Sequence, residues 1–350
     1  MSTQMMQRTY CDPYIIAEIG VNHEGSLDRA KRMIDGVARA GGHAAKFQTY
    51  KAATLASKTT SPAYWDTSKE STPSQFELFS KYDSFGEKEY LALAQHCADN
   101  GIDFLSTPFD LTSVSFLAPL MPAIKIASAD LTNIPLLREV AATGSPVIMS
   151  VGASTFDEID RSVDVLKTSG AAEICLLHCV LKYPTPSEDA NLRVISSLTA
   201  RYGDTATIGY SDHVAPEADG SVPALLLASA LGARVLEKHF TDDRTAPGND
   251  HYHAFDEKGL LHFTQALKEQ RELAGSDAPD IDSQRSAIAN ARRRIFLARD
   301  LHAGEVIAPE ALIPLRADDG IEIAEWDSVV GRRIRCARFA GDPLNVDDIE

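Results

Sequence analysis

The chain has 350 residues, of which 44% are hydrophobic and 24% charged, a composition typical of a globular protein with one large domain and one small domain. Its 34 basic and 50 acidic side chains give a formal net charge of -16. This charge argues against general nucleic-acid binding, which requires a broad basic surface. The sequence has no apolar run of the roughly 18–20 residues that a membrane span needs, and its first residues lack the apolar core of a signal peptide. We therefore expect a cytoplasmic protein without a membrane or nucleic-acid partner.

The cysteine pattern indicates a reducing compartment. The five cysteines are odd in number and lack a CxxC or a paired metal-ligand spacing, which suits reduced thiols. We expect each of them to be buried and structural: Cys11, Cys97, Cys175, Cys179 and Cys336.

From Tyr14 to about Ala274, short apolar runs alternate with longer segments of helical period, which is typical of βα units around a parallel sheet. Eight such units in about 260 residues favour a closed (β/α)8 TIM barrel over an open doubly wound sheet. Helix-start signals support the helices, since Ser26 precedes a periodic run and Ser84 stands three residues before Glu87, as in a capping box. The predicted strands are residues 14–18, 44–48, 103–106, 123–127, 146–150, 173–177, 207–210 and 235–239, and the predicted helices include 27–40, 87–100, 156–169 and 258–274.

The chain is predicted to divide into a barrel domain (1–275), a linker (276–291) and a small β-rich domain (292–350). The linker is rich in small and acidic residues and has no sustained apolar period. The small domain contains IFLARDL, AGEVI, ALIPL, SVVG and RRIRC, which suggest short strands, and its nine basic side chains are all arginine. A length of about 60 residues is near the lower limit for independent folding, so we expect this domain to dock against the barrel or a second subunit.

Polar residues cluster where the predicted strands end, which is where barrel enzymes carry their active sites. Lys46 and Lys125 are the most informative, because each lies in an otherwise apolar strand. A single strand lysine is usually paired or reaches solvent, but two such lysines must lose hydration unless an anion or a carboxylate receives them. A phosphate and a carboxylate bound together would satisfy both. The long segment 49–85 between two strands is predicted to cover this site.

Two histidines near adjacent strand ends, His213 and His239, could supply neutral nitrogens to a divalent metal and leave positions open for substrate and water. From spacing alone, a pair of hydrogen-bonded structural histidines is an equal alternative. His251 and His253 form an HxH that is a less favoured metal pair, because it lies beyond the last strand in a polar loop. The sequence has no GxGxxG, P-loop, HExxH or GxSxG motif, so nucleotide binding and serine hydrolysis lose support.

Strings in the same order along the whole barrel resemble the sialic acid synthase family, which includes the N-acetylneuraminate, legionaminic and pseudaminic acid synthases. They are AEIGVNHEG (17–25), KFQ (46–48), LSTPFD (105–110), KIASAD (125–130), LLHC and YPTP (176–186), GYSDH (209–213), EKHFT (237–241) and PGNDH (247–251). The last 60 residues resemble the antifreeze-like (SAF) domain that follows such barrels.

This resemblance implies a transferase that condenses phosphoenolpyruvate with an amino-sugar aldehyde such as N-acetylmannosamine, releasing phosphate. It implies a divalent metal as Lewis acid, most often manganese, with magnesium or cobalt as alternatives. It also implies a domain-swapped homodimer in which an SAF arginine reaches the partner's sugar site. The implied roles are catalysis by Glu18, His239 and Asp250; phosphoenolpyruvate binding by Lys46, Lys125, Ser128, Ser150 and Ser211; sugar binding by Gln48, Tyr183, Asp250 and Arg316; and metal binding by His213 and His239.

Departures from the family pattern concern the acceptor. Leu181-Lys182 stands where an asparagine usually precedes the tyrosine of YPTP, and Phe255 stands where relatives have methionine or serine. We expect both departures to lie near the acceptor, which could differ from N-acetylmannosamine or be phosphorylated. The rival activity is a class I aldolase in which Lys46 or Lys125 forms a Schiff base with a keto acid.

Overall fold

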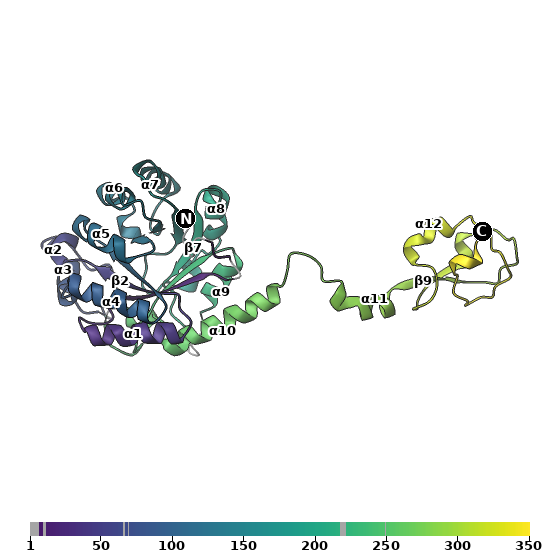
Figure 1. Ribbon diagram of the computed structural model, residues 1–350, viewed down its shortest axis with the longest axis horizontal. Helices are drawn as coiled ribbons and strands as arrows, with labels where there is room; N and C mark the ends of the chain where they lie inside the picture. Colours follow the sequence, from purple (N-terminus) through teal and green to yellow (C-terminus); the bar gives the residue numbers. More distant parts are fainter. Residues whose placement is uncertain (1–6, 10–11, 66, 69, 218–221, 249) are drawn as a thin grey trace. The chain divides into compact units, whose positions relative to one another are not determined.

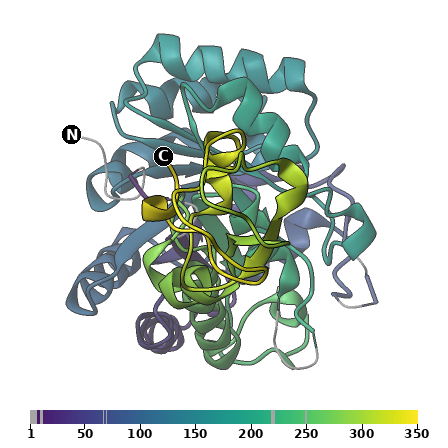
Figure 2. The ribbon, with the colours of Figure 1, turned by 90° about the vertical axis from the view of Figure 1, so that its right-hand side faces the viewer.

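The structure is a computed structural model that describes residues 7–9, 12–65, 67–68, 70–217, 222–248 and 250–350. The chain forms two compact units, Met1–Ala274 and Gly275–Glu350. The colours of Figures 1 and 2 run from purple to green through the first unit and from green to yellow through the second.

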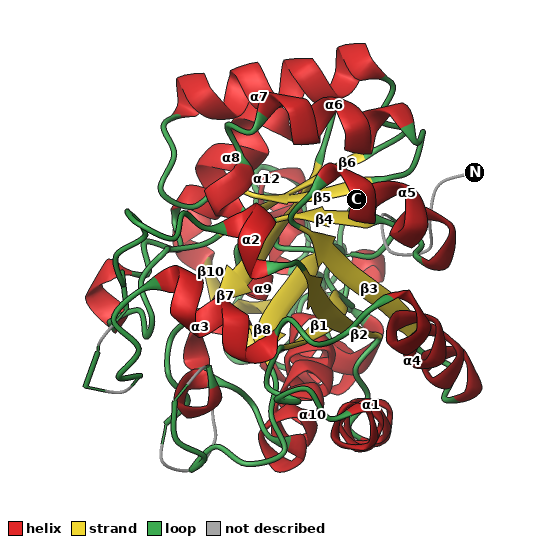
Figure 3. Ribbon diagram, turned by 90° about the vertical axis from the view of Figure 1, so that its left-hand side faces the viewer, coloured by secondary structure: helices red, strands yellow, loops and turns green. Residues whose placement is uncertain are grey.

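Eight parallel strands form the centre of the first unit, and helices surround them (Figure 3). The strand order is β3-β2-β1-β8-β7-β6-β5-β4, and β3 also lies beside β4, so the sheet nearly closes on itself. The predicted barrel is thus confirmed. Its strands are β1 (Tyr14–Gly20), β2 (Ala44–Thr49), β3 (Asp103–Pro108), β4 (Ile124–Ile126), β5 (Val147–Ser150), β6 (Ile174–His178), β7 (Thr207–Asp212) and β8 (Val235–His239).

Both faces of the barrel wall are buried, which explains why its strands read as nearly continuous apolar runs. All seven residues of β1 are buried, for example. In the strand register, Glu18 on β1 lies opposite Lys46 on β2 and His239 on β8. Pairing between adjacent strands therefore brings these three positions to one level of the barrel.

The helices begin and end at local signals. Ser26 caps α1 by accepting from the Arg29 amide, and Gly170, in the left-handed region, ends α7. The predicted Ser84 cap is wrong, because the first residue before α4 is Gly86, whose amide donates to the Glu89 carboxylate. The helices of the first unit are α1 (Leu27–Arg39), α2 (Ala52–Leu55), α3 (Gln75–Tyr82), α4 (Glu87–Asp99), α5 (Leu111–Leu117), α6 (Ile134–Ala142), α7 (Phe156–Ser169), α8 (Val194–Tyr202), α9 (Pro223–Ala230) and α10 (Glu257–Ala274).

The second unit has its own small core, which includes Ile295, Ile334 and Leu344. It consists of the antiparallel pair β9 (Arg293–Leu297) and β10 (Leu312–Arg316), the short helices α11 (Arg285–Ala291) and α12 (Trp326–Val329), and loops. Helix α11 lies inside the segment that was predicted to be a linker (276–291). The SVVG stretch begins as the end of α12 rather than as a strand, and AGEVI and RRIRC form only isolated bridges.

The cysteines of the described residues are free. Cys97, Cys175 and Cys179 are buried as expected, whereas Cys336 is exposed because it lies in a loop of the small unit; Cys11 lies outside the described residues. Within the described parts of the chain, no helix is both long and apolar enough to cross a membrane.

A buried ion pair connects β7 and β8. It lies on the face of the barrel wall opposite to the one that carries Glu237 and His239. The Lys238 ammonium lies 2.6 Å from the Asp212 carboxylate and 2.7 Å from the Val214 carbonyl oxygen. Burial lowers the pKa of Lys238, and Asp212 opposes this shift. Removing one member of such a pair leaves an uncompensated charge in the interior.

We predict that Asp212→Ala lowers the free energy of unfolding of the barrel by about 3–5 kcal/mol, the usual loss when a buried pair is broken. Urea unfolding followed by far-UV circular dichroism measures it. The control is Asp189→Ala, which removes the partner of Lys182 in an exposed pair and should change stability little. Equal losses for the two variants would contradict the prediction.

Candidate active site

A cavity of about 380 Å³ lies at the carboxyl ends of the barrel strands. Its lining includes Glu18, Gln48, Tyr183, His213 and His239. It also includes every residue that was predicted to bind phosphoenolpyruvate: Lys46, Lys125, Ser128, Ser150 and Ser211. With Thr107 of β3, the fold collects side chains from all eight strands or the turns after them into one cavity.

Four charged side chains form a chain of alternating sign in this cavity. The Lys46 ammonium lies 2.5 Å from the Glu18 carboxylate and 3.6 Å from that of Glu237. The Lys125 ammonium lies 3.7 Å from the other oxygen of Glu237. All four residues are at most 5% exposed. The carboxylates thus receive both lysines, which is one of the two alternatives that the sequence left open, and the network has no net formal charge.

Hydroxyl and amide groups complete the network. Lys125 donates to the Ser150 hydroxyl at 2.8 Å, and Ser211 donates to Glu237 at 2.9 Å. Gln48 donates to the second oxygen of Glu18 at 3.1 Å. Ser128 follows β4 in a single 3-10 turn and lines the same cavity. These bonds fix the orientation of the charged groups before any ligand binds.

The two carboxyl groups differ in their electrostatic environment. Burial raises the pKa of Glu18, and the charge of Glu237 adds to this rise, although Lys46 opposes it. Burial also acts to raise the pKa of Glu237, but Lys125 and Lys46 outweigh it and leave that pKa lowered. Glu237 therefore carries the more stable negative charge, and Glu18 is the better proton carrier of the two.

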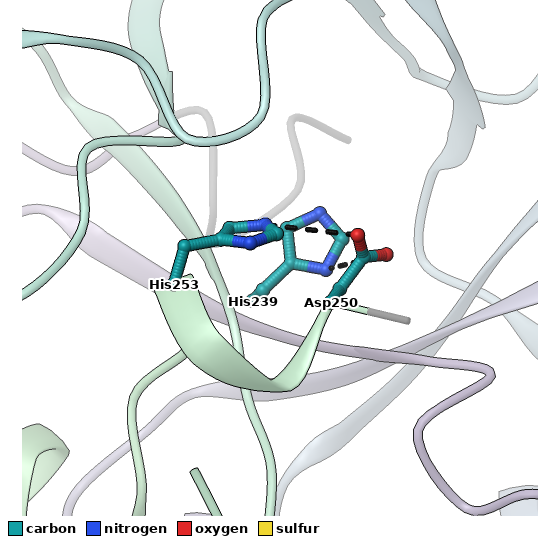
Figure 4. Close-up of side chains that lie close together, drawn as sticks. All are labelled: His239, Asp250 and His253. Atoms are coloured by element: carbon teal, nitrogen blue, oxygen red, sulfur yellow. Dashed lines mark ion pairs between the residues drawn. The ribbon is translucent and has the colours of Figure 1, made fainter. Parts of the chain in front are cut away.

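Beside this network, His239, Asp250 and His253 place one ligand atom each within 4.8 Å of one another. Figure 4 shows the Asp250 carboxylate facing both imidazole rings. One carboxylate oxygen lies 3.4 Å from His239 Nδ1 and the other lies 3.8 Å from His253 Nε2. Neither nitrogen of His253 has a hydrogen-bond partner, although the residue is fully buried. Buried nitrogens without partners are costly in a protein interior, and a metal ion would satisfy them.

The predicted metal ligand His213 lies next to this group, with its ring centre 5.6 Å from that of His239. Its Nδ1 donates to the Val180 carbonyl oxygen at 2.8 Å, which leaves the lone pair on Nε2. Burial lowers the pKa of His213 to about 4 and the pKa values of His239 and His253 well below the ordinary range. Burial, with a contribution from Glu18, raises the pKa of Asp250 to about 7. Neutral imidazoles are the form that binds metals.

The structure separates the two histidines of the HxH. His253 joins His239 and Asp250, whereas His251 Nδ1 shares a hydrogen bond of 2.7 Å with the Thr241 hydroxyl. The other ring nitrogen of His251 lies 3.4 Å from Glu24, which also pairs with Arg29. His251 therefore anchors the loop after β8, and it is His253 that this loop brings to the site.

A second cavity of about 110 Å³ adjoins the first and shares Gln48, Tyr64, Phe79, Tyr183 and His239 with its lining. Asp250 and residues of segment 49–85 line it as well. The long segment thus contributes walls to both cavities, in keeping with its predicted role as a cover.

The structure shows where the two departures from the family pattern lie, at Leu181-Lys182 and at Phe255. Lys182 pairs with Asp189 at 2.8 Å on the surface, and Leu181 alone of that dipeptide lines the larger cavity. Phe255 stacks on Phe263 of α10 and belongs to the lining of neither cavity. Arg316 is exposed on β10 of the second unit, and its sugar-binding role stays a prediction.

Sequence reasoning gave no role to Glu237 or Thr107 and ranked His253 low. Glu237 could have been found, because it shares the inward face of β8 with His239. Thr107 accepts a hydrogen bond from Lys46 at 3.3 Å. His253 had no such signal, because the loop after β8 has no periodic pattern.

Comparison with known proteins agrees with this geometry. Residues 33–278 match the NeuB family, and residues 292–350 match the SAF domain. The chain is 35% identical over 344 residues to the N,N'-diacetyllegionaminic acid synthase of Legionella pneumophila, covering 96% of this chain and 94% of the relative. It is 37% identical over 257 residues to the N-acetylneuraminate-9-phosphate synthase of Drosophila melanogaster, covering 73% of this chain and 67% of the relative.

Among solved structures, the N-acetylneuraminic acid (sialic acid) synthetase of Leptospira borgpetersenii in complex with citrate superposes with a TM-score of 0.67. The two chains are 34% identical, and the match covers 79% of this chain and 90% of the other. The barrel, the cavity at its carboxyl end and these matches lead to one conclusion: the chain belongs to the NeuB family and is an enzyme of the sialic acid synthase type that carries a C-terminal SAF domain.

Proposed function

We propose that this enzyme condenses phosphoenolpyruvate with an amino-sugar aldehyde to give a 2-keto-3-deoxy sugar acid and phosphate. The observation that carries the proposal is the cavity in which two buried lysines lie beside the group of His239, Asp250 and His253. A cationic pair suits a donor with a carboxylate and a phosphate, and a histidine–carboxylate group suits a Lewis acid. The names of the relatives support the same reaction class.

The donor, phosphoenolpyruvate, would be held by two lysines and three serines: Lys46, Lys125, Ser128, Ser150 and Ser211. The Lys46 ammonium contacts Glu18 and Thr107, and the Lys125 ammonium donates to the Ile126 carbonyl oxygen and to Ser150. Glu237 lies 3.6–3.7 Å away, beyond a hydrogen bond, so each ammonium keeps one N–H donor for an incoming oxygen. The serine hydroxyls line the same cavity and rotate to suit a phosphate or a carboxylate. Glu237 would keep both lysines charged and fixed while the donor is absent.

A divalent metal would be held by His239, Asp250 and His253, with His213 beside them. When bound, it would supply Lewis acidity to the acceptor's aldehyde oxygen. A mixed imidazole and carboxylate set suits manganese or cobalt better than magnesium, which prefers oxygen ligands. Of these two metals we propose manganese, which is the one that the resemblance to the sialic acid synthase family implies. Gln48, Tyr183 and Asp250, which line the second cavity, would position the sugar.

In the reaction, the π electrons of the donor's double bond would form the bond between carbon 3 and the aldehyde carbon, and positive charge would develop at carbon 2. The π electrons of the aldehyde would move to its oxygen, which takes up a proton and becomes a hydroxyl. Glu18, held by Lys46 and Gln48, would orient the water that adds at carbon 2 and take its proton on a carboxylate oxygen. The bond between carbon 2 and the bridging oxygen then breaks and releases phosphate. Arg316 of a second copy, in a domain-swapped homodimer, would complete the sugar site.

A class I aldolase is the alternative, because burial lowers the pKa of Lys125 and a Schiff-base lysine needs a lowered pKa. Lys46 is less suited, since Glu18 and Glu237 outweigh its burial and raise its pKa. Borohydride trapping with pyruvate would label Lys125 only if the aldolase mechanism holds.

We predict that the purified chain releases phosphate from phosphoenolpyruvate when Mn²⁺ and an N-acyl hexosamine are present, and that a chelator stops this release. The measurement is a phosphate assay over a panel of hexosamines, with omission of the sugar as the control. Absence of phosphate release with every acceptor would contradict the proposed function.

A second prediction separates the histidines of the HxH. His253→Ala should weaken Mn²⁺ binding by more than about tenfold, since even loss of a ligand's hydrogen-bond partner costs that much. His251→Gln should weaken it less, because His251 only anchors the loop. Isothermal titration with Mn²⁺ measures both, and a larger loss in the His251 variant would refute the assignment.

A third prediction concerns the second unit. Arg316→Ala should raise the KM for the sugar by roughly 10-fold, the effect of losing a charge-assisted hydrogen bond, and leave the KM for phosphoenolpyruvate unchanged. Arg299→Ala, an exposed arginine of the same unit that pairs with Glu305, is the control. Unchanged sugar kinetics in the Arg316 variant would exclude its role in the acceptor site.

A further inference from the structure

Pairs in which aspartate or asparagine precedes glycine are places where a protein chain can modify itself. The glycine amide nitrogen can attack the preceding side-chain carbonyl carbon, because glycine has no Cβ to obstruct the approach. Whether a pair reacts depends on where the fold holds that nitrogen. One such pair, Asp219-Gly220, lies outside the described residues. The described residues contain three: Asp35-Gly36, Asn100-Gly101 and Asp319-Gly320.

The first two pairs are held in unreactive arrangements. Asp35-Gly36 lies inside α1, where a helical amide donates to the carbonyl oxygen four residues earlier. At the end of α4, the Gly101 amide donates to the Ala98 carbonyl oxygen at 3.0 Å. The side-chain amide of Asn100 donates to the His96 carbonyl oxygen at 2.9 Å. In both pairs the glycine nitrogen is therefore directed away from the side chain that it would attack.

The third pair has the opposite arrangement. The Gly320 amide donates to Asp319 Oδ1 at 2.8 Å, so the nitrogen lies against the carboxyl group that it would attack. Asp319 is exposed, so water can leave the group and return to it. Holding two reacting groups in contact turns a slow encounter into an efficient intramolecular step.

The fold requires glycine at this position. Gly320 has a φ of +104°, in the region that residues with a Cβ rarely adopt, and a Cβ there would lie 3.2 Å from Arg294 Cβ. The next residue is fixed to two other segments. The Ile321 amide donates to the Leu344 carbonyl oxygen at 2.7 Å, and its own carbonyl oxygen accepts from the Ile295 amide at 2.9 Å. Exchange of Gly320 for a less reactive residue would therefore strain the small unit.

We propose that Asp319-Gly320 is a site of spontaneous isoaspartate formation that alters the loop beside Arg316. The Gly320 nitrogen bonds to the Asp319 carboxyl carbon, and its proton leaves with the carboxyl hydroxyl group as water, which gives a succinimide ring. Water then adds to the former main-chain carbonyl carbon and breaks the bond from that carbon to the Gly320 nitrogen. The product has the same composition, but its main chain runs through the aspartate side chain and contains one more carbon atom.

The ends of the altered loop are fixed. Residues 317–320 join Arg316, which lies opposite Arg293 in the pairing of β10 with β9, to Ile321. An additional main-chain atom in such a short connection should displace Arg316. The effect on the reaction rests on the proposed role of Arg316 at the sugar, whereas the modification itself does not.

Peptide mapping with electron-transfer dissociation, which distinguishes isoaspartate from aspartate, tests the modification in the full-length protein. During storage of the folded protein, products should accumulate at Asp319 at least about tenfold faster than at Asp35 or Asn100. In guanidinium chloride Asn100 should react fastest, because an unfolded Asn-Gly pair cyclises more readily than an Asp-Gly pair. The same order in both states, or no isoaspartate at Asp319 in the folded protein, would overturn the inference.

Asp319→Glu is the deciding variant. It keeps the charge but would have to form a six-membered ring, so the product at this position should fall by at least about tenfold. Asp318→Glu is the matched control, because it changes the exposed neighbour that does not precede a glycine. It should leave the rate at Asp319 unchanged. An equal fall in both variants would mean that the loop as a whole had changed, and the assignment to this pair would be refuted.

Kinetics of the stored enzyme test the consequence. The kcat/KM for the sugar should fall in proportion to the isoaspartate content, while the KM for phosphoenolpyruvate stays constant, and storage should not affect the Asp319→Glu enzyme. Unchanged sugar kinetics at high isoaspartate content would refute the link to Arg316. An enzyme that uses no hexosamine even when fresh would overturn the proposed function, and the peptide map would decide the modification independently.

Discussion

Four charged side chains lie together inside the carboxyl end of the barrel: Glu18, Lys46, Lys125 and Glu237. Each is at most 5% exposed, and the site depends on how their charges compensate one another. Removing four ionised groups from water costs several kcal/mol for each, and only alternation of sign with added hydrogen bonds can offset it. Adjacent strands provide that alternation, because parallel pairing places Glu18 level with Lys46, and Ser211 level with Glu237. The binding site is therefore built into the sheet.

Two loops add further groups to this site, one after β8 and one after β2. After β8, the contacts of His251 with Thr241 and Glu24 fix the turn from which Asp250 and His253 reach His239. After β2, segment 49–85 adds aromatic walls and the Glu70 carboxylate. The strands thus carry the groups suited to the common donor, while the loops carry those that would select the acceptor. Such a division lets related enzymes keep one chemistry and change the sugar.

Much of this arrangement was predictable from sequence, because it follows from strand periodicity. The barrel follows from the alternation of short apolar runs with segments of helical period, and the two lysines are conspicuous because those runs are otherwise apolar. The shared face of Lys46 and Gln48 follows from the period of two along a strand. The pairing of both lysines with carboxylates was not predictable. Glu237 lies on β8, and only the closed barrel shows which strands lie beside β8. The loop after β8 lacks any period, so His253 could not be ranked above His251. The helix-start signal at Ser84 failed because Gly86 and Glu89 form a competing cap closer to the helix.

In the proposed reaction, phosphate departs from carbon 2 of phosphoenolpyruvate by cleavage of the carbon–oxygen bond and not by attack at phosphorus. Phosphoenolpyruvate carrying the heavy oxygen isotope at the bridging position tests this directly, with mass spectrometry of the released phosphate. If water adds at carbon 2 and the carbon–oxygen bond breaks, the phosphate retains the heavy isotope. Phosphate without the heavy isotope would contradict the account, because the phosphorus–oxygen bond would then have been broken.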